Sequence, residues 1–322
     1  MTNKRVLLID ALNLFMRNYI VDPSLSTNGQ PIGGTKGFIK SLQSVCRTIN
    51  PDIIFVAWDG GSQRRKSVDK NYKAGRKPVR LNRDIHNMTA GEQEDNKNWQ
   101  QERIIEYLNE MPILQSYVEN VEADDIIALV SQSQALSEHH KIILSSDKDF
   151  IQLCDDTTIL YRPIQKEILN KKRILEQFQI HPTNFALARA IAGDKSDNLP
   201  GIGGAGLATV SKRFPFLSED KPYTIQELVD YAEGVDSKLK VFTNTVEKRE
   251  LIEKNYKMMQ LYVPNISAQS AQYIRKMVGS PELNFNKSGV RAMMIEDGFG
   301  AYDWNDLFAL FNKMVVQNKE GR

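Results

Sequence analysis

Short apolar runs that end near an acid constrain the fold of this chain more than any other feature. There are three of them, and each is followed by an aspartate: Val6 to Ile9 by Asp10, Ile53 to Trp58 by Asp59, and Lys141 to Ser145 by Asp147. The runs are continuous in apolar residues rather than alternating, and patterns of helical spacing lie between them. Such strands are typical of a mostly parallel sheet with helices on both faces. The sequence therefore predicts an α/β fold.

The second half of the chain has a different character. From about His181 helical patterns follow one another and strand candidates become scarce; the helical stretches are 185–192, 207–214, 225–232, 251–261 and 304–316. We expect two domains, an α/β domain over residues 1–180 and a helical domain over residues 181–322. A polar segment at about 62–112 interrupts the first domain and begins with a concentration of positive charge.

Composition argues against several classes of protein. The 322 residues are 41% hydrophobic and 25% charged, and the longest apolar runs are far shorter than the roughly 20 residues of a membrane span. No signal peptide is visible. Cys46 and Cys154 are the only cysteines and form no CxxC pair, which argues against a disulfide framework or structural zinc and favours a reducing cytoplasm. The net charge of +2 names no partner, but residues 62–83 carry nine basic side chains and one acid.

Acidic residues gather where ligands bind in parallel sheets. The usual site is the crevice beyond the carboxyl ends of the strands. Nine acids could reach it from strand ends and from the stretches "EADD" and "GDKSD": Asp10, Asp59, Glu122, Asp124, Asp125, Asp147, Asp149, Asp194 and Asp197. Taken singly, each is explained as a turn former, a helix cap or a partner of a helix dipole. Taken together they need cations, because carboxylates about 4 Å apart repel by about 4 kcal/mol per pair at an effective dielectric of 20.

The kind of ligand indicates the kind of ion. Carboxylates without His or Cys favour a hard cation, Mg²⁺ or Mn²⁺. More carboxylates are present than one ion uses, so a two-metal site that cleaves phosphodiesters is the leading interpretation. The basic stretch after Asp59 fits a nucleic-acid substrate, since Lys and Arg neutralise phosphates. Taken alone, that stretch is also explained as a solvated face.

The order and spelling of these motifs resemble the 5′-nuclease family, which includes the nuclease domain of bacterial DNA polymerase I, bacteriophage 5′ to 3′ exonucleases and flap endonucleases. The resembling pieces cover the first two-thirds of the chain in family order: "LLIDALNLFMR" (7–17), "FVAWDGG" (55–61), "YKAGRKP" (72–78), "VEADDIIA" (121–128), "SSDKDFIQL" (145–153) and "GDKSDNLPGIGGAG" (193–206). The resemblance implies a PIN-like catalytic domain whose segment 62–112 forms an arch or clamp over a single-stranded 5′ end. The remainder is too short for a polymerase domain, so a stand-alone, phage-type enzyme is expected.

The resemblance also assigns roles to residues. Asp10, Asp59, Glu122, Asp124 and Asp147 would bind the catalytic metal; Asp149, Asp194 and Asp197 would serve a second. Asp125 joins the ligand candidates, although family members differ there. Two or more Mg²⁺ ions are expected, with Mn²⁺ as a substitute. Lys73 and Arg76 would contact the scissile phosphate, and the remaining DNA contacts are expected from Arg17, from Tyr72 as a base-stacking residue, and from Arg80 and Arg83.

The stretch "GIGGAG" (201–206) satisfies the G-x-G-x-x-G dinucleotide fingerprint, but helical patterns rather than a strand–helix–strand unit surround it. It resembles instead the family's helix, three-turn, helix motif for gripping duplex DNA, through Gly201, Gly203, Gly204 and Gly206. Its amides and carbonyls could meet a phosphate backbone or a monovalent ion such as K⁺. The chain departs from the family at Ala205, usually β-branched, and at Ala208, usually Lys. Either duplex grip is weaker here, or Lys212 and Arg213 supply it.

The sequence thus predicts a metal-dependent 5′-nuclease that takes part in replication or repair. It would act as an exonuclease, as a flap endonuclease, or as both. The expected substrate is DNA with a 5′ flap, a nick or a free 5′ end, with the RNA of RNA–DNA hybrids added by family analogy. We expect a monomer without a membrane partner, in the cytoplasm, or in the host cytoplasm if the gene belongs to a phage. The alternatives are a non-catalytic, structure-specific DNA-binding protein and, from "GIGGAG" alone, a dinucleotide-dependent enzyme.

Overall fold

A computed structural model describes residues 3–74 and 88–320 of the chain. Its main sheet has the order β3-β2-β1-β4-β5-β6. Neighbouring strands from β3 to β5 are parallel, and only the pair of β5 and β6 is antiparallel. The strands are β1 (Arg5–Asp10), β2 (Ile53–Trp58), β3 (Leu114–Tyr117), β4 (His140–Leu144), β5 (Thr158–Arg162) and β6 (Glu167–Leu169). The predicted α/β fold with a mostly parallel sheet is confirmed.

Helices from both halves of the chain pack around this sheet, and several of the second half extend beyond one end of it. The elements up to the sheet's last strand are α1 (Ala11–Val21), α2 (Gly33–Ile49), α3 (Gln63–Val68), α4 (Ala90–Asn109), α5 (Ala123–Ser131) and the 3-10 turns η1 (Gln134–Leu136) and η2 (Lys148–Leu153). Those that follow are α6 (Lys171–Phe178), α7 (Pro182–Ala192), β7 (Gly193–Asp194), β8 (Leu199–Pro200), α8 (Leu207–Arg213), η3 (Pro215–Ser218), α9 (Ile225–Gly234), α10 (Lys240–Glu247), α11 (Arg249–Met259), α12 (Ala268–Gly279), α13 (Lys287–Glu296) and α14 (Trp304–Glu320).

Both faces of the sheet are buried, as its continuous apolar strands require. On one face Leu8 and Phe55 belong to a core with Ile127 of α5, and this core continues into the helices that follow β6. On the other face Leu7 and Val56 belong to a second core built from α1, α2, α4, α13 and α14. Successive residues of β1 therefore serve different cores, because side chains alternate across a strand.

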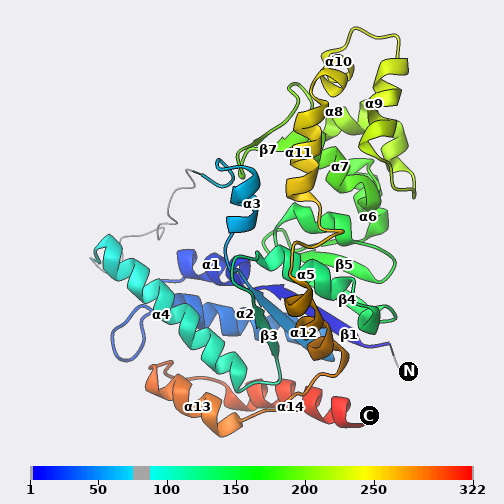
Figure 1. Cartoon of the computed structure of the whole chain (residues 1–322). Helices are drawn as coiled ribbons and strands as arrows, with labels where there is room; N and C mark the ends of the chain where they lie inside the picture. Colours follow the sequence, from blue (N-terminus) through cyan, green and yellow to red (C-terminus); the bar gives the residue numbers. More distant parts are fainter. Residues whose placement is uncertain (1–2, 75–87, 321–322) are drawn as a thin grey trace.

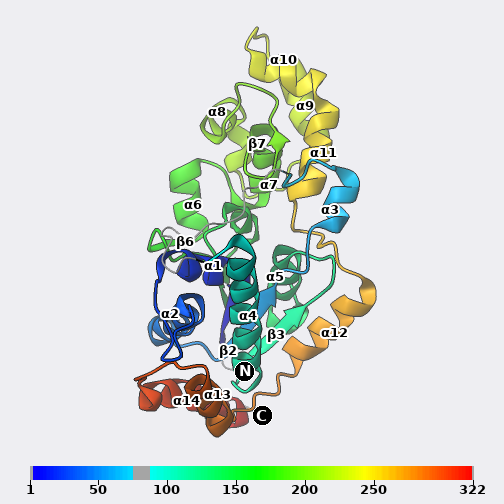
Figure 2. The same cartoon turned by 90° about the vertical axis from the view of Figure 1, so that its left-hand side faces the viewer.

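The helices after β6 lie in two places. In Figure 1, α6 to α11 stand at one end of the molecule, above the sheet, and α13 and α14 lie at the opposite end. Figure 2 shows α12 running along the side between them. It contacts α5 and β3, while α13 contacts α4 and α14 contacts α2. The domain boundary at residue 180 stays a prediction. Any division into domains has to take into account that α12 to α14 pack against elements of the first half of the chain.

Within residues 3–74 and 88–320 no helix is both long enough and apolar enough to cross a membrane. Cys46 and Cys154 are buried and free, as the absence of a disulfide pattern predicted, and burial raises the pKa of each thiol to about 12.

Candidate metal centre

Three parallel strands deliver their acids to one edge of the sheet. In the register of the ladders, Asp10 of β1 lies opposite Ala57 of β2, two residues before Asp59. On the other side, Ile9 lies opposite Leu144 of β4, three residues before Asp147. All three acids are thus placed at the carboxyl edge of the sheet, where the sequence predicted them.

Asp10 is held by neutral groups. Its carboxylate accepts hydrogen bonds from the Asn13 amide at 3.0 Å and from the Ser145 hydroxyl at 3.1 Å, and only 8% of the residue is exposed. The same Ser145 hydroxyl accepts the Asp147 amide at 3.1 Å, which ties the ends of β1 and β4 together. Burial, together with the carboxylates of Asp147 and Asp59, raises the pKa of Asp10 to about 6 against the effect of these hydrogen bonds.

Asp124 belongs electrostatically to the same group. It lies in the first turn of α5. Burial raises the pKa of Asp124 well above its usual value, and the carboxylates of Asp147 and Asp10 add to the increase. The pKa of Asp59 is raised as well, by removal from water and by Glu122. Asp10, Asp124 and Asp147, here called the edge carboxylates, therefore repel one another; Asp10 is buried, Asp124 is half-buried and Asp147 is exposed.

Glu122 is close by but already neutralised. Its carboxylate is bonded to the Arg65 guanidinium and the Lys73 ammonium, and accepts the Tyr72 hydroxyl at 3.1 Å. Burial acts to raise the pKa of Glu122, but the two cations lower it overall. Gly60 allows this approach: its amide donates to Val121, and a Cβ at Gly60 would lie 1.8 Å from the Val118 oxygen. Only glycine fits between Asp59 and the loop that carries Glu122.

Lys73 adopts a backbone conformation that few non-glycine residues take. Its φ is 54°, in the left-handed region, which costs roughly 1–3 kcal/mol. The conformation is supported by a hydrogen bond from the Lys73 amide to the Asp197 carbonyl at 3.1 Å, and by one from the Asn198 side chain to the Asn71 carbonyl at 3.1 Å. The "YKAGRKP" and "GDKSD" motifs, far apart in sequence, are thus joined beside the metal candidates.

Asp149 and Asp194 form a second group around Arg189 of α7, and we call these two acids the bridged carboxylates. The Arg189 guanidinium donates to Asp149 at 3.0 Å and also to Asp194, whose carboxylate accepts the Ser196 amide at 2.8 Å as well. Burial raises the pKa of Asp149 to about 7, with Asp147 adding to the shift. For Asp194 burial acts in the same direction, but Ser196 and Arg189 lower its pKa overall.

The sequence interpretation missed two cations of this centre. Arg189 had a usable signal, because it lies in the last turn of a helix that leads into "GDKSD". Arg65 was counted within the basic stretch, but nothing in its spelling distinguished it from Arg64 as the partner of Glu122. A cation that neutralises a carboxylate is chosen by tertiary contact, which charge patterning along the chain does not specify.

The donor chemistry of the centre fits a hard divalent cation. As they stand, no three acidic, His or Cys side chains within residues 3–74 and 88–320 already surround a single metal position. The edge carboxylates nevertheless offer only oxygen ligands, and burial together with mutual repulsion raises the pKa values of Asp10 and Asp124. A divalent cation relieves that repulsion and prefers such ligands.

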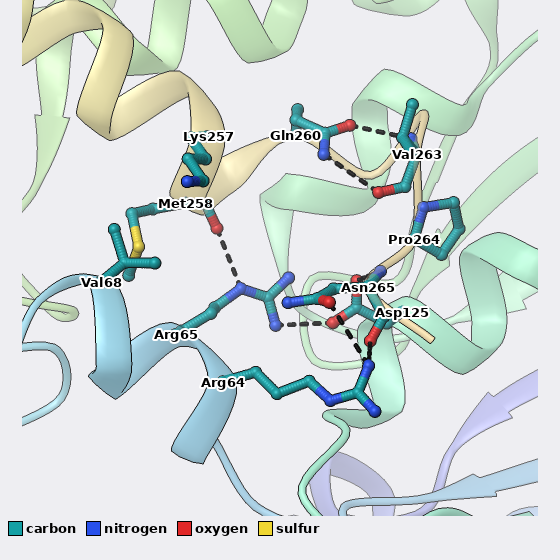
Figure 3. Close-up of a pocket in the computed structure, with 10 residues that line it drawn as sticks. All are labelled: Arg64, Arg65, Val68, Asp125, Lys257, Met258, Gln260, Val263, Pro264 and Asn265. Carbon is teal, nitrogen blue, oxygen red and sulfur yellow. Dashed lines mark hydrogen bonds and ion pairs between the residues drawn. The ribbon is translucent and has the colours of Figure 1, made fainter. Parts of the chain in front are cut away.

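Asp125 does not point to the same place. One of its oxygens pairs with Arg65 at 2.8 Å and the other accepts the Asn265 amide at 2.9 Å, so both are engaged. Figure 3 shows Asp125 on the wall of a pocket of about 230 Å³ between α3 and the chain after α11, with Arg65 also bonded to the Met258 carbonyl. This geometry does not support the prediction of Asp125 as a metal ligand; its contacts connect α5 to the helical end of the molecule.

The predicted DNA contacts have mixed outcomes. Tyr72 is 3% exposed and packs with Leu199, Met258 and Met259, so its ring has no free face for a base, contrary to the prediction. Arg17 is half-buried on α1, and Lys212 is exposed at the end of α8 beside the half-buried Arg213. Arg76, Arg80 and Arg83 lie outside the described residues, as does the part of the predicted arch at 75–87.

The glycine turn at 201–206 lies between β8 and α8, outside any strand–helix–strand unit, which removes the support for a dinucleotide fingerprint. Gly203 and Gly204 have φ values of 90° and 70°, which only glycine adopts readily, and both are exposed. Asn244 and Lys248, which the sequence did not single out, donate to the Ile202 carbonyl. Ala205 is buried in the core, and Ala208 is exposed.

Comparison with known proteins agrees with this fold. The family model for the 5′-3′ exonuclease, N-terminal resolvase-like domain, matches residues 5–179. The chain is 26% identical to a 5′-3′ exonuclease of Aquifex aeolicus over 266 residues, 80% of this chain and 82% of that protein. It is 29% identical to the thermostable DNA polymerase I of Thermus thermophilus over 210 residues, 65% of this chain but only 23% of the polymerase.

A solved structure of the bacteriophage T5 flap endonuclease, in a complex with DNA and metal ions, superimposes with a TM-score of 0.67 at 17% identity, covering 85% of this chain and 98% of the other. At that identity the likeness concerns the fold. The family model, in contrast, covers more than half of the chain. The chain belongs to the 5′-3′ exonuclease family, within the wider group of 5′-nucleases.

Proposed function

We propose that this chain is a metal-dependent 5′-nuclease that hydrolyses phosphodiester bonds near the 5′ ends of DNA, as a 5′ to 3′ exonuclease, a flap endonuclease or both. The convergence of Asp10, Asp59 and Asp147 at one edge of the sheet, beside Glu122 and Lys73, carries the proposal. The exonuclease names of its relatives and the DNA and metal ions of the T5 complex support it.

The proposed cofactor is Mg²⁺, at two or more positions, with Mn²⁺ as a substitute. Asp59, Glu122 and the edge carboxylates are the candidate ligands of the first ion; Asp149, Asp194 and Asp197 are those of the second. When bound, such ions activate a water molecule and neutralise the charge that develops on the phosphate. The chain itself contributes Lys73, whose ammonium lies beside Glu122 and 5.0 Å from the centre of the Tyr72 ring. There it can bind the scissile phosphate, a role that we also assign to Arg76.

The test is cleavage of a 5′-labelled flap substrate in Mg²⁺, Mn²⁺ or EDTA. We expect products in both metals and none in EDTA, with wild-type protein of unchanged fold in each buffer. A non-catalytic DNA-binding protein, the second candidate, predicts binding of the flap without products in any buffer, and that result would overturn the proposal.

Three finer points belong to the same proposal. Substrates with a nick, a free 5′ end or an RNA–DNA hybrid are included, and a product map on each separates exonuclease from endonuclease cleavage. We propose a monomer, which sedimentation of the protein alone and with flap DNA tests. We place the reaction in the cytoplasm because its substrate is DNA under replication or repair.

A further inference from the structure

Two side chains from a distant part of the sequence close the glycine turn at 201–206. Asn244, on α10, donates from its amide nitrogen to the Ile202 carbonyl at 2.8 Å, and to the Gly203 carbonyl at 3.4 Å. Lys248, between α10 and α11, donates from its ammonium to the same Ile202 carbonyl at 3.0 Å. The turn therefore meets a positive charge that belongs to the chain itself.

These contacts leave little of the Ile202 carbonyl for an ion. A carbonyl oxygen has two lone pairs, and here Asn244 and Lys248 each use one. A K⁺ ion held by the carbonyls of this turn would have to displace one of the two donors, and it would then lie beside an ammonium of the same charge. The predicted K⁺ therefore does not fit the turn as it is built.

The position of Lys248 is set by the helices on either side of it. Its amide donates to the Asn244 carbonyl at 2.9 Å, which ends α10, and its own carbonyl accepts the Ile252 amide at 3.1 Å, which begins α11. Asn244 and Lys248 are four residues apart, the spacing that places two side chains on one face of a helix. That face is directed at the turn, as their shared acceptor shows.

The turn is open around Gly204 and Gly206. A Cβ added at Gly204 or Gly206 would meet no atom within 4 Å, and one added at Gly203 would lie 3.9 Å from the Lys248 ammonium. The exposed backbone of Gly203 and the ammonium of Lys248 thus border the same space, next to the open part of the turn at Gly204. A phosphate group approaching the turn finds room, backbone dipoles and a cation together.

We propose that Lys248 takes the place of a bound monovalent cation in the glycine turn and presents its charge to a phosphate of duplex DNA. The inference rests on the proposed function, since it assigns the duplex contact of that same nuclease. It also accounts for Ala208: the charge absent from the first turn of α8 is supplied by the junction of α10 and α11 instead.

The experiment measures binding of a labelled hairpin duplex with a 5′ flap in EDTA, so that cleavage plays no part. In wild-type protein the dissociation constant should agree within twofold between K⁺ and tetramethylammonium at equal ionic strength, because no ion has to enter the turn. A Lys248→Met variant should bind the duplex more weakly, with the slope of log binding constant against log salt reduced by about 0.9, the value for one lost phosphate contact. Binding of single-stranded DNA should change little.

Matched variants separate charge from structure. Lys240→Met removes an exposed lysine from the first turn of α10 and should leave the salt slope unchanged. Lys248→Arg keeps the charge and should restore the slope that Lys248→Met loses, which damage to the turn alone would not allow. Thermal unfolding of each variant reports whether the fold survives.

Two results overturn the inference. One is a wild-type preference for K⁺ over tetramethylammonium of more than threefold in duplex binding. The other is a slope in Lys248→Met equal to that of wild type. Either result with normal flap cleavage contradicts only the role of Lys248, whereas absence of duplex binding and of cleavage in the wild type contradicts the proposed function as well.

Discussion

The edge carboxylates and the bridged carboxylates lie beside each other, but their negative charges are stabilised in different ways. Asp10 is held by an amide and a hydroxyl, which stabilise a carboxylate without cancelling its charge. Asp149 and Asp194 share a guanidinium, which cancels one charge of the two. An external cation therefore gains more from the first group, and at the second it acts together with Arg189.

This difference separates function from stability within one site. A buried carboxylate without a counter-charge lowers the stability of the metal-free protein, so removing its charge raises the stability. Removing one partner of a buried ion pair lowers the stability, because the remaining charge is left unpaired in an apolar environment. An Asp→Asn substitution should thus change the stability in one direction at Asp10 and in the other at Asp194. The four predictions that follow test this contrast, beginning with the largest effect.

Asp10→Asn should lower the rate of flap cleavage in Mg²⁺ roughly a thousandfold while leaving flap binding in EDTA within about threefold of wild type. The change keeps the shape of the side chain but removes a charged ligand from the edge group, a loss comparable to that of a strong electrostatic contact to the transition state. Single-turnover kinetics measure the rate. Asp236→Asn, at an exposed residue before α10, is the matched control. A rate within tenfold of wild type would exclude Asp10 as a metal ligand.

Arg189→Met should reduce the free energy of unfolding in EDTA by about 3 kcal/mol, because Asp149 and Asp194 then face each other without their shared cation. Denaturant titration gives the value. Added Mg²⁺ should raise the free energy of unfolding more in the variant than in the wild type, since in the variant the ion supplies the missing positive charge. Equal stability of variant and wild type in EDTA would show that Arg189 is not needed to neutralise this group.

Asp10→Asn and Asp194→Asn should change the metal-free stability with opposite signs. At pH 7 Asp10→Asn should add about 2 kcal/mol, because the raised pKa of Asp10, about 6, means that folding opposes its ionisation. The gain should vanish below about pH 4, where the wild-type carboxyl is protonated in both folded and unfolded protein. Asp194→Asn should instead cost about 1 kcal/mol at pH 7, since its pKa is lowered by Ser196 and Arg189 against the effect of burial.

Denaturant titrations of both variants in EDTA at several pH values provide the comparison. The same sign for the two variants at pH 7 would contradict the distinction between the groups. A gain for Asp10→Asn that persisted at pH 3 would have to come from packing rather than from charge.

Ser145→Ala should have the smallest effect, a loss of cleavage rate of about tenfold or less. Its hydroxyl connects Asp10 to the Asp147 amide, and a hydrogen bond of this kind contributes about 1 kcal/mol. Ser145 positions Asp10 and Asp147 and does not bond to the bridged carboxylates. Its loss should therefore raise the Mg²⁺ concentration needed for half-maximal cleavage, and should change DNA binding less. An unaltered Mg²⁺ dependence would mean that Asp10 keeps its place without this hydroxyl.

The sequence was enough to predict most of the fold and the gathering of Asp10, Asp59 and Asp147 at one edge of the sheet. Continuous apolar strands that end in Asp10 and Asp59 require a buried parallel sheet, and parallel strands bring their carboxyl ends to one edge. The prediction that Tyr72 stacks on a base was wrong. A tyrosine within a basic stretch suggests contact with nucleic acid, but this ring is buried against Leu199 and its hydroxyl bonds to Glu122. Such contacts depend on how the helical end lies against the sheet, which no local pattern records.

The same limit explains the cations. Arg65, Arg189 and Lys248 act on partners 5 to 57 positions away, and each could equally have been a surface charge. Asp125 shows the converse case, since its spelling beside Asp124 suggests a shared role, but successive residues of a helix lie about 100° apart and these two face different neighbours.

The return of the last helices to the sheet has a consequence for how the molecule is made. Val290 of α13 and Phe311 of α14 are fully buried in the core that also contains Ile104 of α4, and Asp297, just after α13, is bonded to Arg103 of α4. About 180 residues separate α4 from α13. At synthesis rates of roughly 5–20 residues per second, that face of the sheet waits on the order of ten to forty seconds for its cover. By the end of that interval the sheet and the helices up to α12 have been synthesised, while this face of the sheet still exposes apolar surface. The binding sites at the other end of the molecule can therefore form before α13 and α14 pack against the sheet side.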